Sequence, residues 1–315
     1  MKLSVIVPCY NEEGNIPLFH KACVEALSEV LQDTELIYIN DGSKDGTLAE
    51  LSKLVDTSPC AVRVINFSRN FGKEAALLAG LRAGTGEYTV IIDADMQQRP
   101  EYIMEMYKIL EEKPEYDVVA AYQDKRKESK VLSWCKNLFY KVINSLTDVE
   151  FVQSASDFRM FRRVVVDAML SLTERCRFTK GIFAWVGFNT YYMPYKVEAR
   201  ATGKSNWNFF KLLKYAMDGI MAFSVKPLLI VSVLGIIVFM LSIVCTVYVV
   251  IKTLIFGDPV AGFPTLVCLI MMLSGIQLLS IGILGQYLAK NYTETKARPS
   301  YVIKEVLGGD EKHEG

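Results

Sequence analysis

The chain has 315 residues, of which 51% are apolar and 22% are charged, so it is long enough for one large domain or two. Thirty-five basic residues balance 35 acidic ones, which argues against a protein that coats nucleic acid. The seven cysteines show no CxxC pair and no metal-ligand spacing, as expected of a reduced cytoplasmic chain. The apolar run at the start is too short for a signal peptide.

The first part of the chain alternates strands and helices. The stretches LSVIVPCY, ELIYIND, AVRVINFS, EYTVIIDAD and YDVVAAY are predicted strands, because they are apolar and rich in β-branched residues. We expect helices over residues 16–31 and 72–83, and another after the turn GSKDGT, with Asp45 or Thr47 as its N-cap. The pattern predicts an α/β domain over residues 1–204, with a mostly parallel sheet covered by helices on both faces.

Polar residues follow several of these strands, at the sheet edge where such folds bind ligands. Asp93 and Asp95 stand one residue apart in VIIDADMQQRP, and like charges this close repel. A divalent cation such as Mg²⁺ or Mn²⁺, shared with substrate phosphates, would remove the repulsion. No GxGxxG or GxxxxGK[ST] motif offers a glycine cradle for phosphate instead. An acid-rich surface turn is the alternative for an isolated DxD motif.

Beyond residue 204 the composition changes. Residues 205–226 mix aromatic side chains with lysines, which indicates an amphipathic helix at a membrane surface, or an ordinary packed helix. Residues 227–251 and 264–289 are uncharged, and each is long enough to cross a hydrocarbon core of ~30 Å as a transmembrane helix. A buried helical hairpin in a soluble protein is the alternative.

The basic residues around these two segments predict their orientation. Lysines and arginines lie before the first segment and in residues 290–315. The connecting residues 252–263 contain one basic residue, Lys252. The positive-inside rule therefore places the α/β domain and both termini in the cytoplasm, with a short external loop and the chain in the cell (inner) membrane. The last residues, GGDEKHEG, carry no structural signal.

The motifs VPCYNEE, NDGSKDGT and DADMQQRP together resemble family 2 glycosyltransferases with the GT-A fold. FSRNFGKEAALLAGL, SASDFRMFRR, RFTKGIFAWVGF and RATGKSNW resemble the polyprenyl-phosphate branch of that family, which includes bactoprenol glucosyltransferases and relatives of dolichol-phosphate mannose synthase. The resemblance implies a metal-dependent, inverting enzyme that moves one sugar from a UDP-sugar to polyprenyl (undecaprenyl) phosphate at the cytoplasmic membrane face. UDP-glucose is the first choice of donor, and UDP-N-acetylglucosamine and other nucleotide sugars stay open.

The resemblance also implies roles for individual residues. Asp157 matches a catalytic base, but a lipid monophosphate is already largely dianionic at neutral pH. Asp157 would therefore deprotonate only the monoanion, orient the acceptor, or pair structurally with Arg159 or Arg162. For the donor, the resemblance implies that the nucleoside is bound by Pro8, Tyr10, Glu12 and Asp41, and that metal and diphosphate are bound by Asp93 and Asp95, of which Asp95 also takes part in catalysis. Other donor-site residues are Arg69, Lys73 and Gln97, and the residues that close over the diphosphate are Arg200 and Lys204. The acceptor phosphate is expected to contact Arg126 and Lys136.

Several alternatives accompany this hypothesis. The run that contains Arg126 and Lys136 is explained about as well by a solvated basic loop beside anionic head groups. A processive polysaccharide synthase would show a QxxRW motif and more membrane spans, and a non-catalytic nucleotide-sugar sensor would not need the intact acids at 93, 95 and 157. The resemblance further implies a homo-oligomer such as a tetramer. A separate flippase would be needed, because two helices are too few for a translocation channel.

Overall fold

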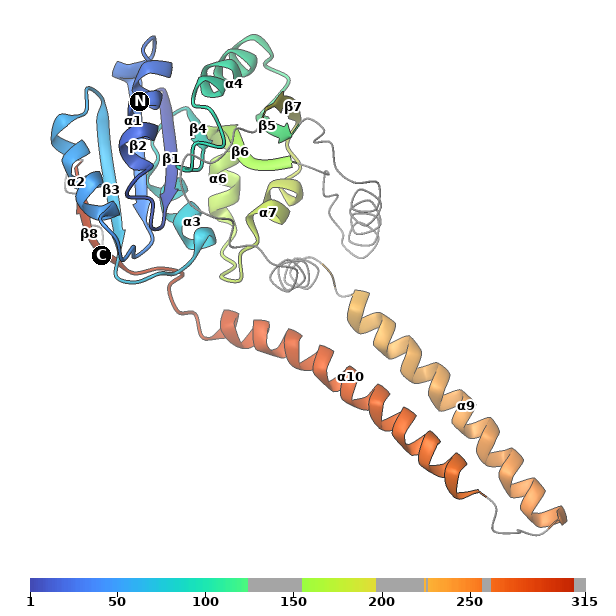
Figure 1. The fold of residues 1–315 in the computed structure, drawn as a ribbon. Coiled ribbons are helices and arrows are strands. Elements are labelled where there is room, and N and C mark those ends of the chain that lie inside the picture. The colour runs from blue at the N-terminus through green and yellow to red at the C-terminus, as the bar shows by residue number, and fades with distance from the viewer. Residues whose placement is uncertain (124–154, 197–223, 225, 257–261, 309–315) are drawn as a thin grey trace.

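The computed structural model describes residues 1–123, 155–196, 224, 226–256 and 262–308. Figure 1 shows an α/β domain from which two long helices project together to one side. The described part of the domain contains an eight-stranded mixed sheet. In spatial order its strands are β7 (Thr190–Tyr195), β5 (Val118–Gln123), β6 (Ala155–Arg162), β4 (Tyr88–Ile91), β1 (Leu3–Cys9), β2 (Thr34–Asn40), β3 (Ala61–Phe67) and β8 (Ile303–Leu307).

The central strands β4, β1, β2 and β3 are parallel, so their carboxyl ends lie at one edge of the sheet. The apolar stretches that predicted these strands are mostly buried, since helices cover both faces. β6 runs antiparallel between β4 and β5, and β7 is parallel to β5. The insertion of β6 places residues near 157 beside the end of β4, which the sequence did not predict.

Six described helices pack on the two faces. Residues of α1, α2 and α4 contribute to the core on one face, and residues of α3, α6 and α7 contribute to the core on the other. Alternate residues of β1 divide in the same way, with Val5 in the first core and Ile6 in the second. The helices are α1 (Ile16–Ala26), α2 (Thr47–Thr57), α3 (Lys73–Ala83), α4 (Glu101–Glu112), α6 (Arg163–Ser171) and α7 (Thr179–Trp185).

Two predicted helix boundaries were wrong. The first helix ends at Ala26 rather than at residue 31, because the chain turns after the buried Leu27 and passes through a short 3₁₀ helix, η1 (Leu31–Asp33), into β2. At α2 the N-cap is Gly46, and neither Asp45 nor Thr47 occupies that position. Asp45 nevertheless accepts hydrogen bonds from the backbone N–H of Thr47 (3.1 Å) and from its hydroxyl (2.6 Å), which fixes the start of the helix.

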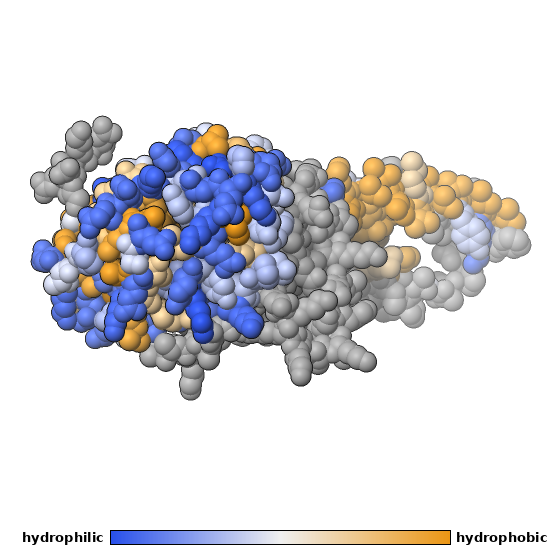
Figure 2. All heavy atoms as spheres, turned by 90° about the horizontal axis from the view of Figure 1, so that it is seen from above, coloured by the Kyte–Doolittle hydropathy of each residue, from blue (hydrophilic) through white to orange (hydrophobic). Residues whose placement is uncertain are grey.

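The two projecting helices are α9 (Lys226–Phe256) and α10 (Phe263–Thr295). Their described apolar side chains are largely exposed, and Figure 2 shows many of them as hydrophobic (orange) atoms beside the more polar domain. Within the described residues, one stretch, Met272–Thr295, is long and apolar enough to cross a membrane, and Lys226–Val238 forms a shorter apolar helix. The hydroxyl of Tyr287 donates a hydrogen bond of 2.6 Å to the carbonyl of Ser224, which ties α10 to the chain just before α9.

After α10 the chain returns to the domain and adds β8 to the edge of the sheet, antiparallel to β3. The amide of Asn66 donates a hydrogen bond of 2.6 Å to Glu305, and the ring of Tyr301 stacks on Phe67 with centroids 5.0 Å apart. No strand was predicted from the sequence after the second apolar segment. Because β8 pairs with β3, the segment that follows α10 is anchored to the sheet of the domain.

Candidate active site

A cavity of about 300 Å³ lies at the carboxyl ends of β1, β2 and β4. Residues from four separate parts of the sequence meet there, because the parallel strands deliver their following loops to one sheet edge. Seven residues selected from the sequence line it, namely Pro8, Tyr10, Glu12, Asp41, Lys73, Asp93 and Asp95. Cys9, Asn70, Gly72, Ala76 and Ala94, which the sequence analysis did not select, complete the lining.

The loops after β1 and β2 fix one another. Asn11 has a positive φ of 56°, which asparagine tolerates better than most residues. Its backbone N–H donates to the hydroxyl of Ser43 (2.9 Å), and its side-chain oxygen accepts from the N–H of Lys44 (2.9 Å). The N–H of Glu12 donates to the hydroxyl of Thr47 (2.8 Å). Tyr10 and Glu12 therefore lie at the cavity on a loop that is hydrogen-bonded to the residues after β2.

Asp41 is buried at the end of β2 and holds the loop that leads into α3. Its carboxylate accepts backbone hydrogen bonds from Phe71 (2.6 Å) and Gly72 (2.9 Å). Burial raises the pKa of Asp41, although these two hydrogen bonds and the charge of Arg69 partly offset the effect. Gly42 follows with a φ of 63°, and a Cβ there would lie only 2.4 Å from the backbone of Arg69. The close contact between the two loops requires glycine at this position.

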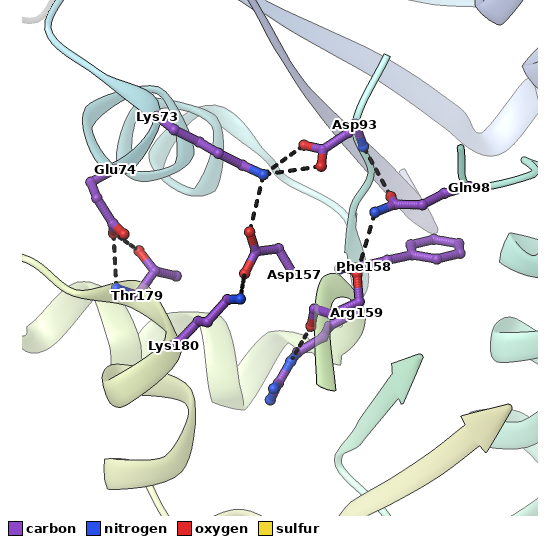
Figure 3. Close-up of polar contacts among 10 residues, drawn as sticks. Lys73, Glu74, Asp93, Gln98, Asp157, Phe158, Arg159, Thr179 and Lys180 are labelled. Atoms are coloured by element: carbon purple, nitrogen blue, oxygen red, sulfur yellow. Dashed lines mark hydrogen bonds and ion pairs between the residues drawn. The ribbon is translucent and has the colours of Figure 1, made fainter. Parts of the chain in front are cut away.

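A chain of charges joins the cavity to β6 and α7 (Figure 3). The Lys73 ammonium group lies 2.8 Å from Asp93 Oδ1 and donates a hydrogen bond of 3.0 Å to Asp157 Oδ2. Lys180 of α7 lies on the other side of Asp157, with its Nζ 3.8 Å from Oδ1. Asp157 thus pairs with two lysines, one of which, Lys180, the sequence analysis did not select.

These contacts determine the ionisation of the network. Burial favours the neutral form of Lys73, but the nearby carboxylates of Asp93 and Asp157 outweigh it and raise the pKa of Lys73. Burial likewise opposes ionisation of Asp157, and the charges of Lys73 and Lys180 outweigh it to lower the pKa of Asp157 to about 2. Lys73 and Asp157 are therefore both charged at neutral pH.

The alternative for Asp157 was a structural ion pair with Arg159 or Arg162. The hydrogen bonds of these two arginines go to other groups. Arg159 Nε donates to the carbonyl of Ser156 (3.1 Å), and its guanidinium lies over the ring of Phe183. Arg162 donates to the carbonyls of Tyr116 (3.0 Å) and Leu110 (2.5 Å). Both arginines support the fold around β6, and among the described residues the ion-pair partners of Asp157 are the two lysines.

Neighbouring contacts hold the two ends of this network. The backbone N–H of Asp93 donates to Gln98 Oε1 (3.1 Å), and the Gln98 amide donates to the hydroxyl of Ser156 (3.3 Å), next to Asp157. Gln98 is buried and links the loop after β4 to β6, a structural role that the sequence did not indicate. The backbone N–H of Gln97 donates to Asp95 Oδ1 (3.1 Å).

Glu74 fixes α3 against α7. Its carboxylate accepts hydrogen bonds from both the backbone N–H of Thr179 (2.8 Å) and the Thr179 hydroxyl. Burial raises the pKa of Glu74, and the bonds from Thr179 partly offset this rise. Because Lys73 and Lys180 are the neighbours of Glu74 and Thr179 in sequence, this contact sets the distance between the two lysines that face Asp157.

Asp93 and Asp95 suit a divalent cation that is shared with a substrate. Both carboxylates line the cavity, and Mg²⁺ or Mn²⁺ accepts one or two protein carboxylates when phosphates and water supply the remaining oxygens. Within the described part of the chain, no group of three or more His, Cys, Asp or Glu residues is placed to hold a metal ion by itself. The donor set therefore fits a cation that binds together with a diphosphate.

The remaining residues selected from the sequence lie near this site or outside the described ranges. Arg69 lies in the loop before α3, with its guanidinium carbon 4.2 Å from the centre of the Phe71 ring. Arg126, Lys136, Arg200 and Lys204 fall within residues 124–154 and 197–223, outside the described residues.

Comparison with known proteins identifies the family. The profile described as "Glycosyl transferase family 2" matches residues 4–170, which contain the cavity and Asp157. The chain belongs to glycosyl transferase family 2. Its sheet, with the acidic pair after β4, is the α/β domain of this family, as the resemblance implied.

Family 2 relatives of similar length match nearly the whole chain. CsbB of Bacillus subtilis (strain 168), provisionally named a glycosyltransferase, is 40% identical over 305 residues, which cover 96% of this chain and 92% of the relative. The prophage bactoprenol glucosyl transferase homolog of Escherichia coli (strain K12) is 37% identical over 306 residues, covering 97% and 99%. The bactoprenol glucosyl transferase of Shigella phage SfX is 37% identical over 304 residues, covering 96% and 99%. This family 2 chain is thus similar to named bactoprenol glucosyl transferases beyond its catalytic domain.

Proposed function

We propose that this family 2 enzyme transfers one sugar from a UDP-sugar, with glucose as the first choice, to polyprenyl phosphate at the cytoplasmic face of the membrane. The observation that carries the proposal is the cavity in which Asp93 and Asp95 lie beside the Lys73–Asp157 pair. Near full-length similarity to proteins named bactoprenol glucosyl transferases supports the choice of sugar and acceptor.

The donor would lie across the carboxyl ends of β1, β2 and β4. Pro8, Tyr10, Glu12 and Asp41 would contact its nucleoside, with Arg69 and Gln97 nearby and with Arg200 and Lys204 closing over the diphosphate. Asp93 and Asp95 would hold Mg²⁺ or Mn²⁺ against that diphosphate. When bound, the cation supplies positive charge to the leaving nucleotide.

Lys73 adds a second, permanent positive charge. Its ammonium group lies between Asp93 and Asp157, and its raised pKa keeps it protonated throughout the physiological pH range. The leaving UDP gains negative charge as its bond to the sugar breaks, so a fixed cation beside it lowers the barrier. We assign Lys73 to this role, with Asp157 and Glu74 holding its position.

Asp157 is better suited to positioning than to proton removal. With a pKa of about 2, it holds a proton poorly at neutral pH. The acceptor is a phosphate monoester whose second pKa is about 6, so its oxygen is already largely deprotonated. We infer that Asp157 keeps Lys73 and Lys180 in place, and that these lysines face the phosphates on either side of the reacting carbon.

The reaction would be one displacement. An oxygen of the lipid phosphate forms a bond to the anomeric carbon while the bond from that carbon to the UDP oxygen breaks. The electron pair of the broken bond leaves with UDP, and the configuration at carbon inverts. An α-linked donor would then give a β-linked lipid-phosphate sugar.

The helices α9 and α10 would anchor the enzyme as two transmembrane helices. With 31 and 33 residues, they are roughly 46 and 50 Å long at a rise of 1.5 Å per residue, more than a ~30 Å hydrocarbon core requires. Their exposed apolar side chains, among them Ile236, Ile237, Leu278 and Leu279, suit contact with lipid. The distribution of lysine and arginine favours a cytoplasmic domain and an external loop between the helices.

A radiochemical assay tests the proposal. Membranes that contain the enzyme would be incubated with Mg²⁺, undecaprenyl phosphate and a panel of labelled UDP-sugars, and the chloroform-soluble label would be counted. Label from UDP-glucose is the expected result. Label from UDP-N-acetylglucosamine alone would change the assigned sugar, and donor binding without a lipid product would instead favour a nucleotide-sugar sensor.

A further inference from the structure

A second polar cavity lies where α10 meets the domain. This junction pocket has a volume of about 320 Å³, and it is lined by Arg82 of α3, by Arg175 and Arg177 of the loop between α6 and α7, and by Ser300 and Tyr301 between α10 and β8. Arg82 lies at the last turn of α3, whereas Lys73 lies at the first, so the pocket and the donor cavity are at opposite ends of this helix.

The walls of the junction pocket are fixed to the end of α10. The carboxylate of Glu294 accepts backbone hydrogen bonds from Arg175 (2.9 Å) and Cys176 (2.7 Å). The guanidinium of Arg175 donates a bond of 3.0 Å to the carbonyl of Arg298. The pocket is therefore a built feature of the boundary between the domain and the apolar helix, rather than a gap between mobile side chains.

The junction pocket carries excess positive charge. Besides the bond from Arg175 to a carbonyl, Arg177 donates to the carbonyls of Leu172 (3.0 Å) and Met169 (3.2 Å), and Arg82 donates to the hydroxyl of Tyr301 (3.4 Å). These acceptors are neutral. Among the described residues that line the pocket, Glu174 is the one carboxylate. Burial raises its pKa, Arg177 partly offsets the rise, and the neighbouring carboxylate of Glu294 adds to it.

This arrangement suits a phosphate ester. Guanidinium groups bind phosphate oxygens through paired N–H donors, and three of them around a space of this size leave donors that the carbonyls do not use. Burial lowers the pKa of Arg177, and the charge of Glu174 opposes this shift. A bound anion would likewise favour the charged guanidinium of Arg177. The hydroxyl groups of Thr173 and Ser300 also line the pocket and can donate to the same anion.

The position of the pocket favours a lipid as the source of that phosphate. An open, largely apolar surface lies on the preceding turns of α10, formed by Gly285, Leu288, Ala289, Asn291, Tyr292 and Thr295. We propose that the junction pocket binds the phosphate group of an anionic membrane lipid whose chains lie along this apolar surface of α10. The proposal rests on the membrane attachment in the proposed function, but not on the transfer reaction. Such a lipid would hold the domain at a fixed height above the bilayer.

The test compares three soluble probes with the full-length protein in an uncharged detergent. Dihexanoyl phosphatidylglycerol, dihexanoyl phosphatidylcholine and inorganic phosphate are titrated separately, and their affinities are measured from the rise in thermal midpoint. Phosphatidylglycerol is expected to bind, and the other two probes to bind at least tenfold more weakly. Inorganic phosphate that binds as tightly as phosphatidylglycerol would overturn the lipid assignment.

Matched variants separate the pocket from general surface charge. The double variant Arg82→Gln/Arg175→Gln is expected to weaken phosphatidylglycerol binding at least tenfold. Arg298→Gln removes an exposed charge beside the pocket whose side chain does not line it, and should leave the affinity within twofold. Equal losses in both variants, or no loss in the double variant, would contradict the proposal.

Two further measurements keep the result interpretable. If circular dichroism shows that the double variant is unfolded, Arg82→Gln alone is used, because Arg82 is exposed, and a loss of at least threefold is expected. UDP binding is measured in every variant and should not change. Phosphatidylglycerol binding in an enzyme that transfers no sugar would therefore refute the proposed function alone, and sugar transfer without phosphatidylglycerol binding would refute only the junction pocket.

Discussion

Lys73 Nζ donates a hydrogen bond of 3.0 Å to Asp157 Oδ2, which joins the first residue of α3 to a residue of β6 that lies 84 positions later. The same ammonium group contacts Asp93 at the edge of the donor cavity. This single cation therefore connects the acidic pair after β4 with the carboxylate on β6.

Replacement of Lys73 by methionine should lower the turnover number of sugar transfer by about 100-fold, since removing one group that stabilises developing charge typically has an effect of this size. Lys180→Met is the matched control. Lys180 Nζ forms a partly exposed ion pair of 3.8 Å with Asp157, and such a pair contributes up to about 1 kcal/mol, so its loss should cost less than about tenfold. Initial rates with saturating donor and acceptor measure both effects. Equal losses in the two variants would contradict the special role of Lys73.

The same variant should bind metal more tightly in the absence of donor. Lys73 neutralises Asp93, so a cation that binds to Asp93 must overcome its repulsion, and removing Lys73 leaves that carboxylate free to attract the metal. Titration of Mn²⁺ followed by electron paramagnetic resonance should show a dissociation constant several-fold lower for Lys73→Met than for wild type. A higher dissociation constant would mean that Lys73 helps to build the metal site.

The pH dependence of transfer should reflect the acceptor rather than Asp157. Asp157, with a pKa of about 2, stays ionised from pH 5 to pH 9. The rate should fall as the pH drops through about 6, because the acceptor phosphate then becomes a monoanion and a poorer nucleophile. Asp157→Asn should show the same acidic limb at a lower maximum rate. If the limb is absent in wild type and present only in Asp157→Asn, Asp157 acts as a base after all.

Asp41→Ala should destabilise the domain by about 2 kcal/mol, because the N–H groups of Phe71 and Gly72 would lose their buried acceptor. Asp56→Ala is the control, since Asp56 lies exposed on α2. Thermal unfolding of both variants measures the difference, and UDP binding should weaken together with stability in Asp41→Ala alone. An Asp41→Ala variant as stable as the control would show that the loop before α3 is held by other contacts.

Much of the donor cavity follows from strand order and motif position. Tyr10, Asp41 and Asp93 follow three strands whose apolar sequences predict burial, and the carboxyl ends of parallel strands must lie together. Lys180 could not be predicted in this way, because it does not follow one of the parallel strands. It lies on a short helix after β6, and only the antiparallel insertion of β6 brings that helix against α3.

The end of the chain shows a similar limit. IKEVL, the sequence of β8, is short and its side chains are largely exposed, so neither burial nor length marks it as a strand. It pairs with β3 because α10 returns the chain to that edge of the sheet. The hydrogen bond between Asn66 and Glu305 has no sequence signal, since 239 positions separate the two residues.

The most direct test of the account is lipid-linked sugar formation by the variant Asp93→Ala/Asp95→Ala, assayed in membranes with labelled UDP-glucose, undecaprenyl phosphate and a chelator. No chloroform-soluble label above that of membranes without the enzyme is expected, while wild type with Mg²⁺ should give label that the chelator abolishes. Undiminished label from the double variant in the presence of chelator would contradict a metal-dependent role for Asp93 and Asp95.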